Sequence, residues 1–512
     1  MQELRNPHEA AQWLRARVTG TLSPDSRTLT AGDGFIAWPG GVVDGRAFVK
    51  AALARGAAAC LVEREGAQAF AFAEDSIGCY AGLKADTGAI AAEFFGRPSR
   101  ELALVAITGT NGKTSTAWWL AQALSALPPG RTLACGVIGT LGVGRPPAAG
   151  HTTADSARQL FSTGLTTPDP VLLQKALRQF VDSGLQACSI EASSIGIEEH
   201  RLDATDIRVA DFTNLTQDHL DYHGTMEAYG QAKRKLFAWP GLRSAVVNVD
   251  DGFGMMLAQT LGQQAVDLWT FSCQRPARLQ ASNLSYDTGG LRFDVVEQGG
   301  ENRLLQTRMI GSYNVSNLLG VLAAMRALGV PLVAAVQACR ALHPVPGRME
   351  CVGEADEPLV AVDYAHTPDA LAQALTALRP LAQQRGGSLW CVFGCGGDRD
   401  SAKRPLMGAI ASQKADQVVV TSDNPRSEKP ESIVAQILLG LTPSPTVSVQ
   451  VDRALAISQV IARAGARDVI LLAGKGHEET QEVAGIKRRF SDKHQALQAL
   501  STRRSQGIGV SA

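Results

Sequence analysis

The feature that most constrains this chain is an apolar strand that runs into a glycine-rich loop and then into a helix. The strand is expected at 104–108, and the helix after the loop is expected to run through Trp118, Trp119 and Leu124. Glycines let backbone N–H groups approach phosphate oxygens, the helix start adds a favourable dipole, Lys113 can neutralise charge, and the Thr114 hydroxyl can bind Mg²⁺. A plain glycine-rich turn is the alternative, but the order of strand, loop and helix favours a phosphate-binding loop. Its residues are Gly109, Thr110, Asn111, Gly112, Lys113, Thr114 and Ser115.

The rest of the chain shows an alternation of strand-like and helix-like segments. From about residue 105 onward, apolar β-branched runs end in Gly, Asn or Asp and lead into Ala- and Leu-rich stretches, which predicts an α/β fold. In open parallel sheets ligands gather at the carboxyl ends of strands, so chemistry is expected where polar residues follow these strands. The polar segment 274–301 is expected to form a β-hairpin. The strands are expected at 104–108, 187–190, 209–212, 245–249, 389–393, 417–421 and 469–473.

Chain length and two breaks predict the domain organisation. A chain of 512 residues is too long for one ordinary core and suggests about three domains. Gly96-Arg97-Pro98-Ser99 precedes the first strong strand, and 343–348, which contains two prolines, interrupts a helical run. The predicted domains are therefore 1–102, 103–343 and 344–512.

Composition excludes several classes of function. Lys and Arg balance Asp and Glu at 49 each, so no polyanion-binding surface and no nucleic-acid partner are expected. No apolar stretch is long enough to cross a bilayer and the start of the chain lacks an apolar core, so a cytoplasmic protein without membrane contact is expected. The nine cysteines are scattered, apart from Cys391 and Cys395 with no common zinc spacing. They are expected to be reduced and mostly buried.

The phosphate loop is unusual because its first glycine stands two residues closer to the Gly-Lys pair than in the common pattern. With Glu191-Ala192-Ser193-Ser194, the run 213–221 and Ala232-Lys233, this short loop resembles the Mur ligase family. The resemblance implies that Thr114, Glu191, His219 and a carbamoylated Lys233 bind magnesium, and that Lys113, Glu191, His219 and Lys233 are catalytic. Hard cations with oxygen ligands suit the charge of a nucleotide. Read alone, Glu191 can be a surface residue or a helix cap, and Asp218 and Asp221 can be helix-capping residues.

Three later stretches resemble the elements of this family that close over the nucleotide. They are Gly311-Ser312-Tyr313-Asn314-Val315-Ser316-Asn317, Gly347-Arg348-Met349-Glu350 and Asp363-Tyr364-Ala365-His366-Thr367-Pro368-Asp369. The resemblance implies ATP contacts from Asn317, Arg348 and Asp363, with Asn314 and His366 beside them. A helix cap for the asparagines and a turn for His-Thr-Pro are the alternatives.

The N-terminal segment resembles the uridine-nucleotide-binding domain of the family members that add the third and later residues. Pro24-Asp25-Ser26-Arg27 and 40–46 carry this likeness, and Thr166-Thr167-Pro168-Asp169 is similar to the element that holds a muramoyl dipeptide. One departure is Ile195, where the family usually has histidine, so no role of that histidine is carried over. Arg27 and Arg46 can instead be solvated surface charges. The implied UDP-substrate residues are Ser26, Gly41, Val42, Val43, Thr166, Thr167, Ser193, Glu199 and Arg201.

The stretch Asp423-Asn424-Pro425-Arg426 at the end of a strong strand matches the motif of diaminopimelate-adding members. Meso-diaminopimelate differs from lysine by a distal carboxylate, which the planar guanidinium of Arg426 can bind with two hydrogen bonds. Without the family, Asp-Asn-Pro is simply a good turn. Gly394–Asp400 and Gly474–Glu478 also resemble third-domain signatures. The implied amino-acid pocket consists of Arg399, Asp423, Asn424, Pro425, Arg426, Gly474 and Glu478, with Glu478 facing an ammonium group.

Taken together, the resemblance implies an ATP-dependent amide-bond-forming ligase of peptidoglycan biosynthesis. It would add meso-2,6-diaminopimelate to UDP-N-acetylmuramoyl-L-alanyl-D-glutamate through an acyl phosphate, with ATP and Mg²⁺, as a monomer that binds only small molecules. The fold implied is a smaller N-terminal α/β domain for the UDP-substrate, a central P-loop parallel-sheet ATPase domain and a C-terminal Rossmann-like domain for the amino acid. The alternatives are an L-lysine-adding ligase, a P-loop phosphotransferase or NTPase switch, and a catalytically silent nucleotide-binding module.

Overall fold

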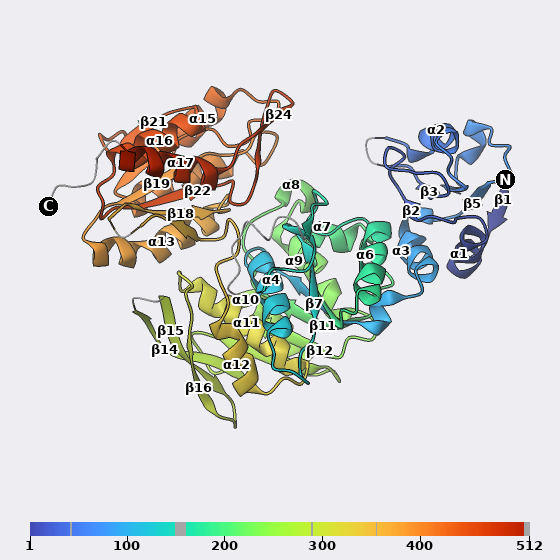
Figure 1. Cartoon of the computed structure of the whole chain (residues 1–512), viewed down its shortest axis with the longest axis horizontal. Helices are drawn as coiled ribbons and strands as arrows, with labels where there is room; N and C mark the ends of the chain where they lie inside the picture. Colours follow the sequence, from blue (N-terminus) through green and yellow to red (C-terminus); the bar gives the residue numbers. More distant parts are fainter. Residues whose placement is uncertain (41–42, 149–159, 288–289, 355, 506–512) are drawn as a thin grey trace.

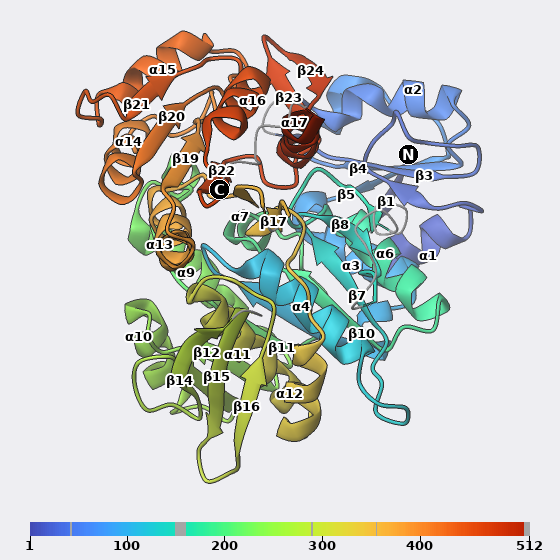
Figure 2. The same cartoon turned by 60° about the vertical axis from the view of Figure 1, so that its left-hand side comes forward.

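The computed structural model describes residues 1–40, 43–148, 160–287, 290–354 and 356–505. Helices and largely parallel sheets alternate along the chain in three successive units, so the predicted α/β class is confirmed. Figure 1 and Figure 2 show the first unit (blue) and the third unit (orange to red) above the central unit. The sheet of the first unit ends by residue 80, that of the central unit spans 103–306, and that of the third unit spans 350–473. The cuts predicted near 102 and 343 fall between these sheets, and the functional division into domains stays a prediction.

The first unit is a five-stranded parallel sheet in the order β1-β5-β4-β3-β2. Apolar residues fill both of its faces, one against α1 and α3 and the other against α2. Its first helix begins after Asn6, whose side chain accepts a hydrogen bond from the Glu9 backbone N–H. The elements are β1 (Gln2–Leu4), α1 (Pro7–Arg15), β2 (Leu22–Ser23), β3 (Gly34–Ala37), α2 (Val49–Ala54), β4 (Ala59–Glu63), β5 (Ile77–Tyr80) and α3 (Leu83–Phe94).

The central unit contains an eleven-stranded sheet in the order β16-β15-β14-β13-β12-β11-β6-β10-β7-β8-β9. The strands from β14 to β7 in this order are parallel, while β14, β15 and β16 form antiparallel pairs, which confirms the hairpin predicted within 274–301. The strands are β6 (Ala103–Thr108), β7 (Cys135–Gly139), β8 (Gly142–Gly144), β9 (Leu160–Phe161), β10 (Ala187–Glu191), β11 (Ile207–Phe212), β12 (Ser244–Asn248), β13 (Asp267–Ser272), β14 (Leu279–Asp287), β15 (Gly290–Glu297) and β16 (Asn302–Gln306).

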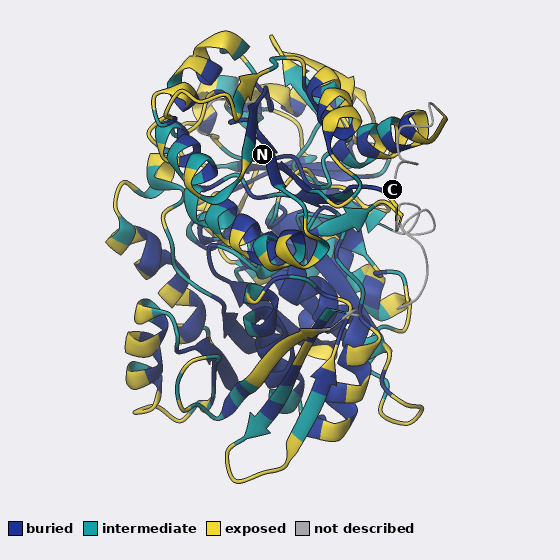
Figure 3. Cartoon of the chain, turned by 90° about the vertical axis from the view of Figure 1, so that its left-hand side faces the viewer, coloured by how far each residue is buried: buried dark blue, intermediate teal, exposed yellow. Residues whose placement is uncertain are grey.

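Helices cover both faces of the central sheet. On one face α4 and α11 are buried along most of their lengths, because α12 packs against both of them. Figure 3 shows buried residues gathered inside the molecule and exposed residues on its outer helices. The other face packs under α6 and α10. The helices are α4 (Lys113–Ser125), α6 (Pro170–Asp182), α7 (Ser194–Glu198), α8 (Leu220–His223), α9 (Met226–Arg234), α10 (Gly252–Leu261), α11 (Tyr313–Ala327) and α12 (Leu332–Arg340).

The third unit is a six-stranded sheet in the order β17-β18-β22-β19-β20-β21, parallel except for β17. A separate antiparallel hairpin, β23 with β24, follows the sheet and was not predicted. The elements are β17 (Glu350–Val352), β18 (Leu359–Asp363), α13 (Pro368–Arg385), β19 (Leu389–Phe393), α14 (Lys403–Lys414), β20 (Gln417–Val420), α15 (Pro430–Leu438), β21 (Val447–Val449), α16 (Arg453–Arg463), β22 (Val469–Ala473), β23 (Thr480–Val483), β24 (Ile486–Arg489) and α17 (Asp492–Ser505).

Two expectations from composition can be compared with the structure. Seven of the nine cysteines are buried while Cys273 and Cys351 are half-buried, so the expectation of mostly buried cysteines is confirmed. Among the described helices, none combines the length and the apolar character that crossing a membrane requires.

One buried acid stands out in the central sheet. Asp211 on β11 has no exposed surface, and neither of its carboxyl oxygens has a hydrogen-bond partner among the described residues. It lies under α11 at Gly320, where an added Cβ atom would stand 3.2 Å from Asp211 Oδ2. Burial raises the pKa of Asp211 to about 8 from an ordinary 3.8. The folded protein therefore holds a proton that the unfolded chain releases at neutral pH.

We expect Asp211→Asn to change how stability depends on pH. Between pH 3.8 and about 8 the folded state binds one more proton at Asp211 than the unfolded state, so wild-type stability falls as pH rises. The loss is about 1.4 kcal/mol for each pH unit within that window. The melting temperature of the variant minus that of the wild type should therefore rise from pH 4 toward about 8 and then level off. A difference that stays constant over this range would show that Asp211 is not held protonated.

Candidate active site

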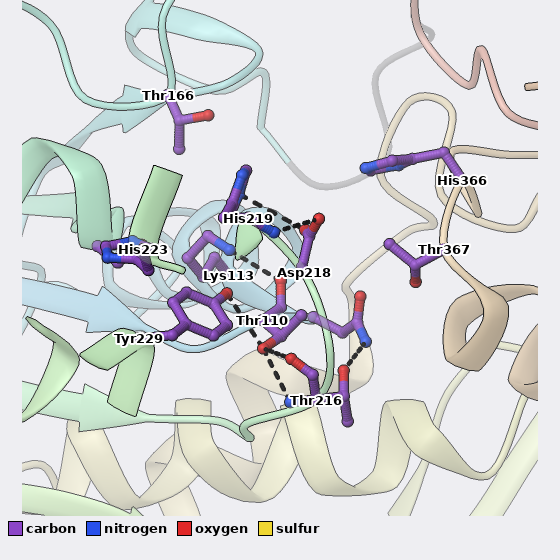
Figure 4. A network of polar contacts seen from close by, with 12 residues as sticks. Thr110, Lys113, Thr166, Thr216, Asp218, His219, His223, Tyr229, His366 and Thr367 are labelled. Atoms are coloured by element: carbon purple, nitrogen blue, oxygen red, sulfur yellow. Dashed lines mark hydrogen bonds and ion pairs between the residues drawn. The ribbon is translucent and has the colours of Figure 1, made fainter. Parts of the chain in front are cut away.

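The loops predicted to carry chemistry meet at one edge of the central sheet. Strand β6 lies between β10 and β11, with Ile107 paired to Glu191 and Thr108 paired to Phe212. Because these strands are parallel, the phosphate loop, the start of α7 and the segment after β11 all leave the sheet at the same edge. The close view in (Figure 4) shows the resulting network of polar contacts around Lys113 and Thr110.

The phosphate loop closes tightly over its own lysine. Lys113 Nζ donates hydrogen bonds to the backbone oxygens of Gly109 and Thr110, at 2.8 and 2.9 Å. Burial lowers the pKa of Lys113, while Glu191 and Asp218 partly oppose that shift. Gly112 has a φ of +87°, and a Cβ atom there would stand 2.3 Å from Asn317 Oδ1. The loop therefore requires glycine at this position for both conformation and space.

The segment after β11 holds the phosphate loop from the side. Asn214 Oδ1 accepts a hydrogen bond from the Asn111 backbone N–H at 2.9 Å, and the Asn214 backbone oxygen accepts one from the Thr110 N–H at 2.8 Å. Thr213 Oγ1 donates to the Asn111 backbone oxygen at 2.6 Å. Thr110 Oγ1 donates to the Thr216 backbone oxygen at 3.1 Å (Figure 4). These hydrogen bonds fix the position of the loop against the segment after β11.

Two of the four predicted metal ligands are in direct contact. Thr114 Oγ1 donates to Glu191 Oε2 at 2.9 Å, and the Glu191 carboxylate also accepts from the Thr140 backbone N–H at 2.8 Å. Glu191 is 1% exposed at the end of β10, so the alternatives of a surface residue and a helix cap are wrong. Hydroxyl and carboxylate oxygens fit a hard cation such as Mg²⁺. Within the described residues no group of three His, Cys, Asp or Glu side chains is placed to hold an ion. Mg²⁺ is commonly bound by one or two carboxylates together with phosphate oxygens and water, which the Thr114 and Glu191 pair allows.

The other two predicted ligands, Lys233 and His219, both contact the ring of Tyr229. Lys233 Nζ lies 4.2 Å from the ring centre and donates to the Gly109 backbone oxygen at 2.8 Å. Burial, reinforced by Lys113, lowers the pKa of the Lys233 amine well below its usual value. The His219 ring packs edge-on against the Tyr229 ring, with 6.0 Å between the ring centres. Burial lowers the pKa of His219 to about 4. Both side chains thus lie at the loop and favour their neutral forms.

The alternative in which the acids of the Asp-His-Leu-Asp run cap a helix is wrong for Asp218. His219 occupies the residue before α8, with a left-handed φ of +53°, and no side chain caps that helix. The Asp218 carboxylate instead accepts from the His219 backbone N–H at 2.9 Å. Burial acts to raise the pKa of Asp218, but His366, His219, Lys403 and Lys113 outweigh it and lower the pKa. Left-handed conformations of non-glycine residues are often found at functional sites.

The third unit reaches the phosphate loop directly. Arg348 Nη2 donates to Thr114 Oγ1 at 3.3 Å, and Asn111 Nδ2 donates to Asp369 Oδ2 at 3.0 Å. Asp363 is buried at the end of β18, and its carboxylate accepts from the Met349 N–H at 2.6 Å, which fixes the backbone next to Arg348. Burial raises the pKa of Asp363 even though Arg348 opposes the shift. These contacts place the linker between the second and third units beside the loop.

The remaining predicted nucleotide elements also lie near the loop. Asn317 Nδ2 donates to Asn314 Oδ1 at 3.0 Å inside α11, so neither asparagine caps that helix. Thr367 caps α13, and His366 Nδ1 lies 2.8 Å from the Tyr364 backbone oxygen. Figure 4 shows His366 and Thr367 across from Asp218 and His219. The structure therefore brings elements of the second and third units to the two sides of one space.

The residues predicted to hold the UDP-substrate form a second group next to Glu191. Thr167 Oγ1 donates to the Glu191 backbone oxygen at 2.7 Å, and Thr166 Oγ1 lies 3.1 Å from Thr140 Oγ1. Ser193 Oγ lies 3.0 Å from Thr167 Oγ1, and Arg201 donates to the Thr167 backbone oxygen at 3.0 Å. These four predicted residues thus surround one stretch of backbone at the end of β10.

The first unit is joined to this group through Glu199. Lys84 of α3 pairs with Glu199 Oε2 at 2.6 Å, and the Tyr222 hydroxyl donates to Oε1 at 2.6 Å, which together lower the pKa of Glu199. In the first unit Ser26 is half-buried and Val43 exposed, whereas the predicted Gly41 and Val42 lie outside the described residues.

The two arginines that could be solvated surface charges differ in their exposure. Arg27 is exposed and pairs with Asp25 at 2.8 Å, as that alternative expected. Arg46 is only 7% exposed and pairs with Asp44 at 2.7 Å, so for Arg46 the alternative of a solvated surface charge is wrong.

The predicted amino-acid pocket gathers at the carboxyl edge of the third sheet. Asn424 Nδ2 donates to Glu478 Oε2 at 2.7 Å, which joins the Asp-Asn-Pro-Arg turn to the loop after β22. Gly474 has a φ of +116°, and a Cβ atom there would stand 2.4 Å from Asp423 Oδ2. Arg399 is exposed beside Asp398. The two loops are therefore packed directly against each other, with the Asp423 carboxylate against Gly474.

Arg426 is held in an unusual backbone conformation. Its φ is +52°, and its backbone N–H and C=O bond to Glu482 and Ala484 of the unpredicted hairpin, at 3.1 and 2.7 Å. Its Nη1 donates to the Gly397 backbone oxygen at 2.6 Å. The Nε and Nη2 atoms have no hydrogen-bond partner among the described residues, which leaves one two-donor edge of the guanidinium available to a carboxylate.

Sequence reasoning missed several polar residues that build these loops. Lys475, Asp369 and Lys84 bond Glu478, Asn111 and Glu199 respectively. Lys475 stands inside the recognised 474–478 stretch, between two glycines, and that position was the available signal. Nothing in the local sequence of Lys84 marks it, because its partner lies more than a hundred residues away in another unit.

This chain is similar to known proteins along most of its length. Three family models match the chain: the Mur ligase family catalytic domain over 21–85, the Mur ligase middle domain over 107–325 and the Mur ligase glutamate ligase domain over 347–476. The UDP-N-acetylmuramoyl-L-alanyl-D-glutamate–2,6-diaminopimelate ligase of Acidovorax sp. (strain JS42) is 60% identical over 98% of this chain and 99% of its own length.

Solved structures show the same relationship. A UDP-N-acetylmuramoyl-L-alanyl-D-glutamate–2,6-diaminopimelate ligase is 35% identical with a TM-score of 0.63, covering 94% of this chain and 95% of that one. The MurF ligase of Thermotoga maritima in complex with ADP shares the fold, with a TM-score of 0.64 at 19% identity over 96% of this chain and 99% of that one. On this evidence the chain belongs to the Mur ligase family.

Proposed function

We propose that this protein is an ATP-dependent ligase that adds meso-2,6-diaminopimelate to UDP-N-acetylmuramoyl-L-alanyl-D-glutamate in peptidoglycan biosynthesis. The observation that carries the proposal is the contact between the phosphate loop and the third unit, through Arg348 to Thr114 and Asn111 to Asp369. These contacts join the nucleotide loop to the unit that carries Arg426, as a reaction between a phosphorylated acid and an amine requires. The 60% identical Acidovorax relative bears the name of this activity.

The reaction proceeds in two balanced steps. The γ-phosphoryl group of ATP moves to the carboxylate of the D-glutamyl residue, giving ADP and an acyl phosphate, and the amine of diaminopimelate then displaces phosphate to form the amide. Lys113 and the N–H groups at the start of α4 bind the phosphates and stabilise the charge that develops during transfer. Magnesium, when bound at Thr114 and Glu191, supplies further neutralisation of phosphate charge.

The other predicted residues bind and align the two carbon substrates. Thr166, Thr167, Ser193 and Arg201 hold the muramoyl dipeptide beside Glu191, so the acid to be activated lies next to the phosphate loop. The free edge of Arg426 binds the distal carboxylate of diaminopimelate, and Glu478 binds an ammonium group. We propose that the protein acts on these small molecules as a monomer.

We further propose that Lys233 becomes a carbamate that contributes to the magnesium site. The neutral amine is the form that attacks carbon dioxide, forming a C–N bond and releasing a proton, and burial together with Lys113 favours that neutral form. A carbamate would place a negative charge beside the loop where the ammonium form places a positive one. Its oxygens could therefore act as ligands of a magnesium ion.

The Lys233 proposal predicts a large loss of activity in Lys233→Ala. We expect turnover to fall by about a hundredfold or more, since one stabilising group of the transferring phosphoryl is lost. Lys235→Ala is the matched control, because Lys235 is an exposed residue of the same segment that pairs with Glu198. NMR of wild-type protein in isotope-labelled bicarbonate should show one carbamate signal that Lys233→Ala lacks. Full activity of Lys233→Ala would contradict the proposal.

Phosphate release with each substrate omitted in turn tests the ligase proposal. A ligase should release phosphate only when ATP, the UDP-dipeptide and the amino acid are all present, because the acyl phosphate is consumed by the amine. Release that ignores the amine would support the phosphotransferase or NTPase switch instead, and no release under any condition would support the silent module.

A further inference from the structure

A fully buried lysine lies behind the predicted amino-acid pocket. Lys475 follows β22 between Gly474 and Gly476, both with positive φ, and its side chain has no exposed surface. Lysine is almost never fully buried unless it is paired, so this position needs a specific reason. Lys475 belongs to none of the functions assigned so far.

Lys475 bonds two of the residues predicted to bind the amino acid. Its Nζ donates to Asn424 Oδ1 at 3.0 Å and to Glu478 Oε2 at 2.8 Å, while Asn424 Nδ2 donates to the same Glu478 oxygen at 2.7 Å. The backbone N–H of Glu482 adds a second donor to Asn424 Oδ1 at 3.0 Å. These bonds fix the orientation of the Asn424 amide, because its oxygen faces two donors and its nitrogen faces a carboxylate.

The same bonds divide the Glu478 carboxylate into two different oxygens. Oε2 accepts from both Lys475 and Asn424, whereas Oε1 has no hydrogen-bond partner among the described residues. The Glu478 side chain is 30% exposed, so the carboxylate meets both the buried lysine and the open side of the pocket. The free oxygen can therefore bind a donor from a ligand without breaking the bonds behind it.

We propose that Lys475 is a positioning residue of the amino-acid pocket, which holds Asn424 and Glu478 in one unit so that Glu478 Oε1 receives the ammonium group of the incoming diamino acid. The proposal rests on the proposed function, because it assumes an amino-acid substrate in this pocket. Lys475 acts through Glu478 and does not itself touch the substrate. Preorganisation of this kind lowers the cost of ordering the carboxylate on binding.

The proposal predicts a specific defect in Lys475→Met. The KM for meso-diaminopimelate should rise about tenfold or more, since a charge-assisted hydrogen bond behind the pocket is lost. The KM values for ATP and the UDP-dipeptide should stay within about twofold of wild type, because both bind elsewhere. Lys414→Met, at a half-buried lysine in α14 whose Nζ bonds Thr376 and none of the pocket residues, should leave all three KM values unchanged.

A double-mutant cycle with Glu478→Gln separates positioning from general damage. If Lys475 acts through Glu478, Lys475→Met should change the KM for diaminopimelate by less than about twofold in the Glu478→Gln background. The double variant Lys475→Met with Glu478→Gln contains no unpaired buried charge. The comparison of this double variant with Glu478→Gln therefore remains possible if Lys475→Met alone fails to fold. Lys475→Arg is measured alongside them.

The outcomes distinguish this proposal from the proposed function. Wild-type protein that does not turn over meso-diaminopimelate would overturn the proposed function and this proposal together. Wild-type turnover with an unchanged KM for diaminopimelate in folded Lys475→Met and Lys475→Arg would overturn only the positioning role. An equal effect of Lys475→Met with and without Glu478→Gln would also overturn it, whereas the predicted loss of effect supports it.

Discussion

Lys113→Met is expected to lower release of ADP and phosphate by about a thousandfold, with binding of the UDP-dipeptide unchanged. Lys113 is the positive charge at the centre of the phosphate loop, and its ammonium is already held by the Gly109 and Thr110 backbone oxygens at the start of α4. Charged groups that stabilise a transferring phosphoryl group contribute about 10³-fold or more to turnover. Methionine keeps most of the volume but removes the charge, so the loop should stay folded.

The control for Lys113→Met is substrate binding in the same variant. The predicted UDP-dipeptide residues, such as Thr167 and Arg201, bond each other and the end of β10 without contacting Lys113. Calorimetric titration with the UDP-dipeptide should therefore give a Kd within about twofold of wild type. Turnover of Lys113→Met near the wild-type rate would show that phosphate transfer does not take place at this loop.

Arg426→Met is expected to impair diaminopimelate addition by about a hundredfold in kcat/KM and to leave any L-lysine addition unchanged. The guanidinium has one edge free of protein partners, and a distal carboxylate would form two charge-assisted hydrogen bonds there. L-Lysine has no carboxylate at that end, so it does not use this edge. Rates are measured with each amino acid at fixed ATP and UDP-dipeptide.

Two companion variants sharpen the Arg426 experiment. Arg426→Lys keeps the charge but not the two-donor fork, so it should recover only part of the loss. Arg488→Met, at an exposed arginine of β24 in the same unit, should behave as wild type. Equal losses with diaminopimelate and lysine in Arg426→Met would mean that Arg426 supports the loop, through its Gly397 contact, and does not read the distal carboxylate.

The framework of the molecule could be predicted from sequence because its signals are local. The strands predicted at 389–393 and 469–473 are β19 and β22 with the same bounds, since each is an apolar run that ends at glycine. The loop at 109–115 could be placed because glycines, lysine and threonine stand between a strand and a helix. Parallel pairing then places several loops at one edge, whatever the details of packing.

The contacts that organise the site could not be predicted, because they join residues far apart in sequence. Asn111 and Asp369 are 258 positions apart, and Arg348 and Thr114 are 234 apart. No periodicity or composition links such pairs. The β23 and β24 hairpin was also missed, although its bonds to the Arg426 backbone hold that residue in place.

Buried ionisable residues were a second feature that could not be predicted from the sequence. Asp211 and Lys475 belong to residue types that usually lie at the surface, and both are fully buried. Lys475 is compensated by Glu478, and Asp211 by keeping its proton. Whether a burial site offers a partner is decided by tertiary structure, so a sequence alone does not reveal which charged residues are internal.

The most direct test of the proposed function is a competition between the two amino acids. Wild-type protein is incubated with ATP, UDP-N-acetylmuramoyl-L-alanyl-D-glutamate and an equimolar mixture of meso-diaminopimelate and L-lysine. Product masses and released phosphate are then determined together. The account predicts a tripeptide product that carries diaminopimelate, with one phosphate released for each amide formed. A product that carries mainly lysine, or phosphate release without amide formation, would contradict it.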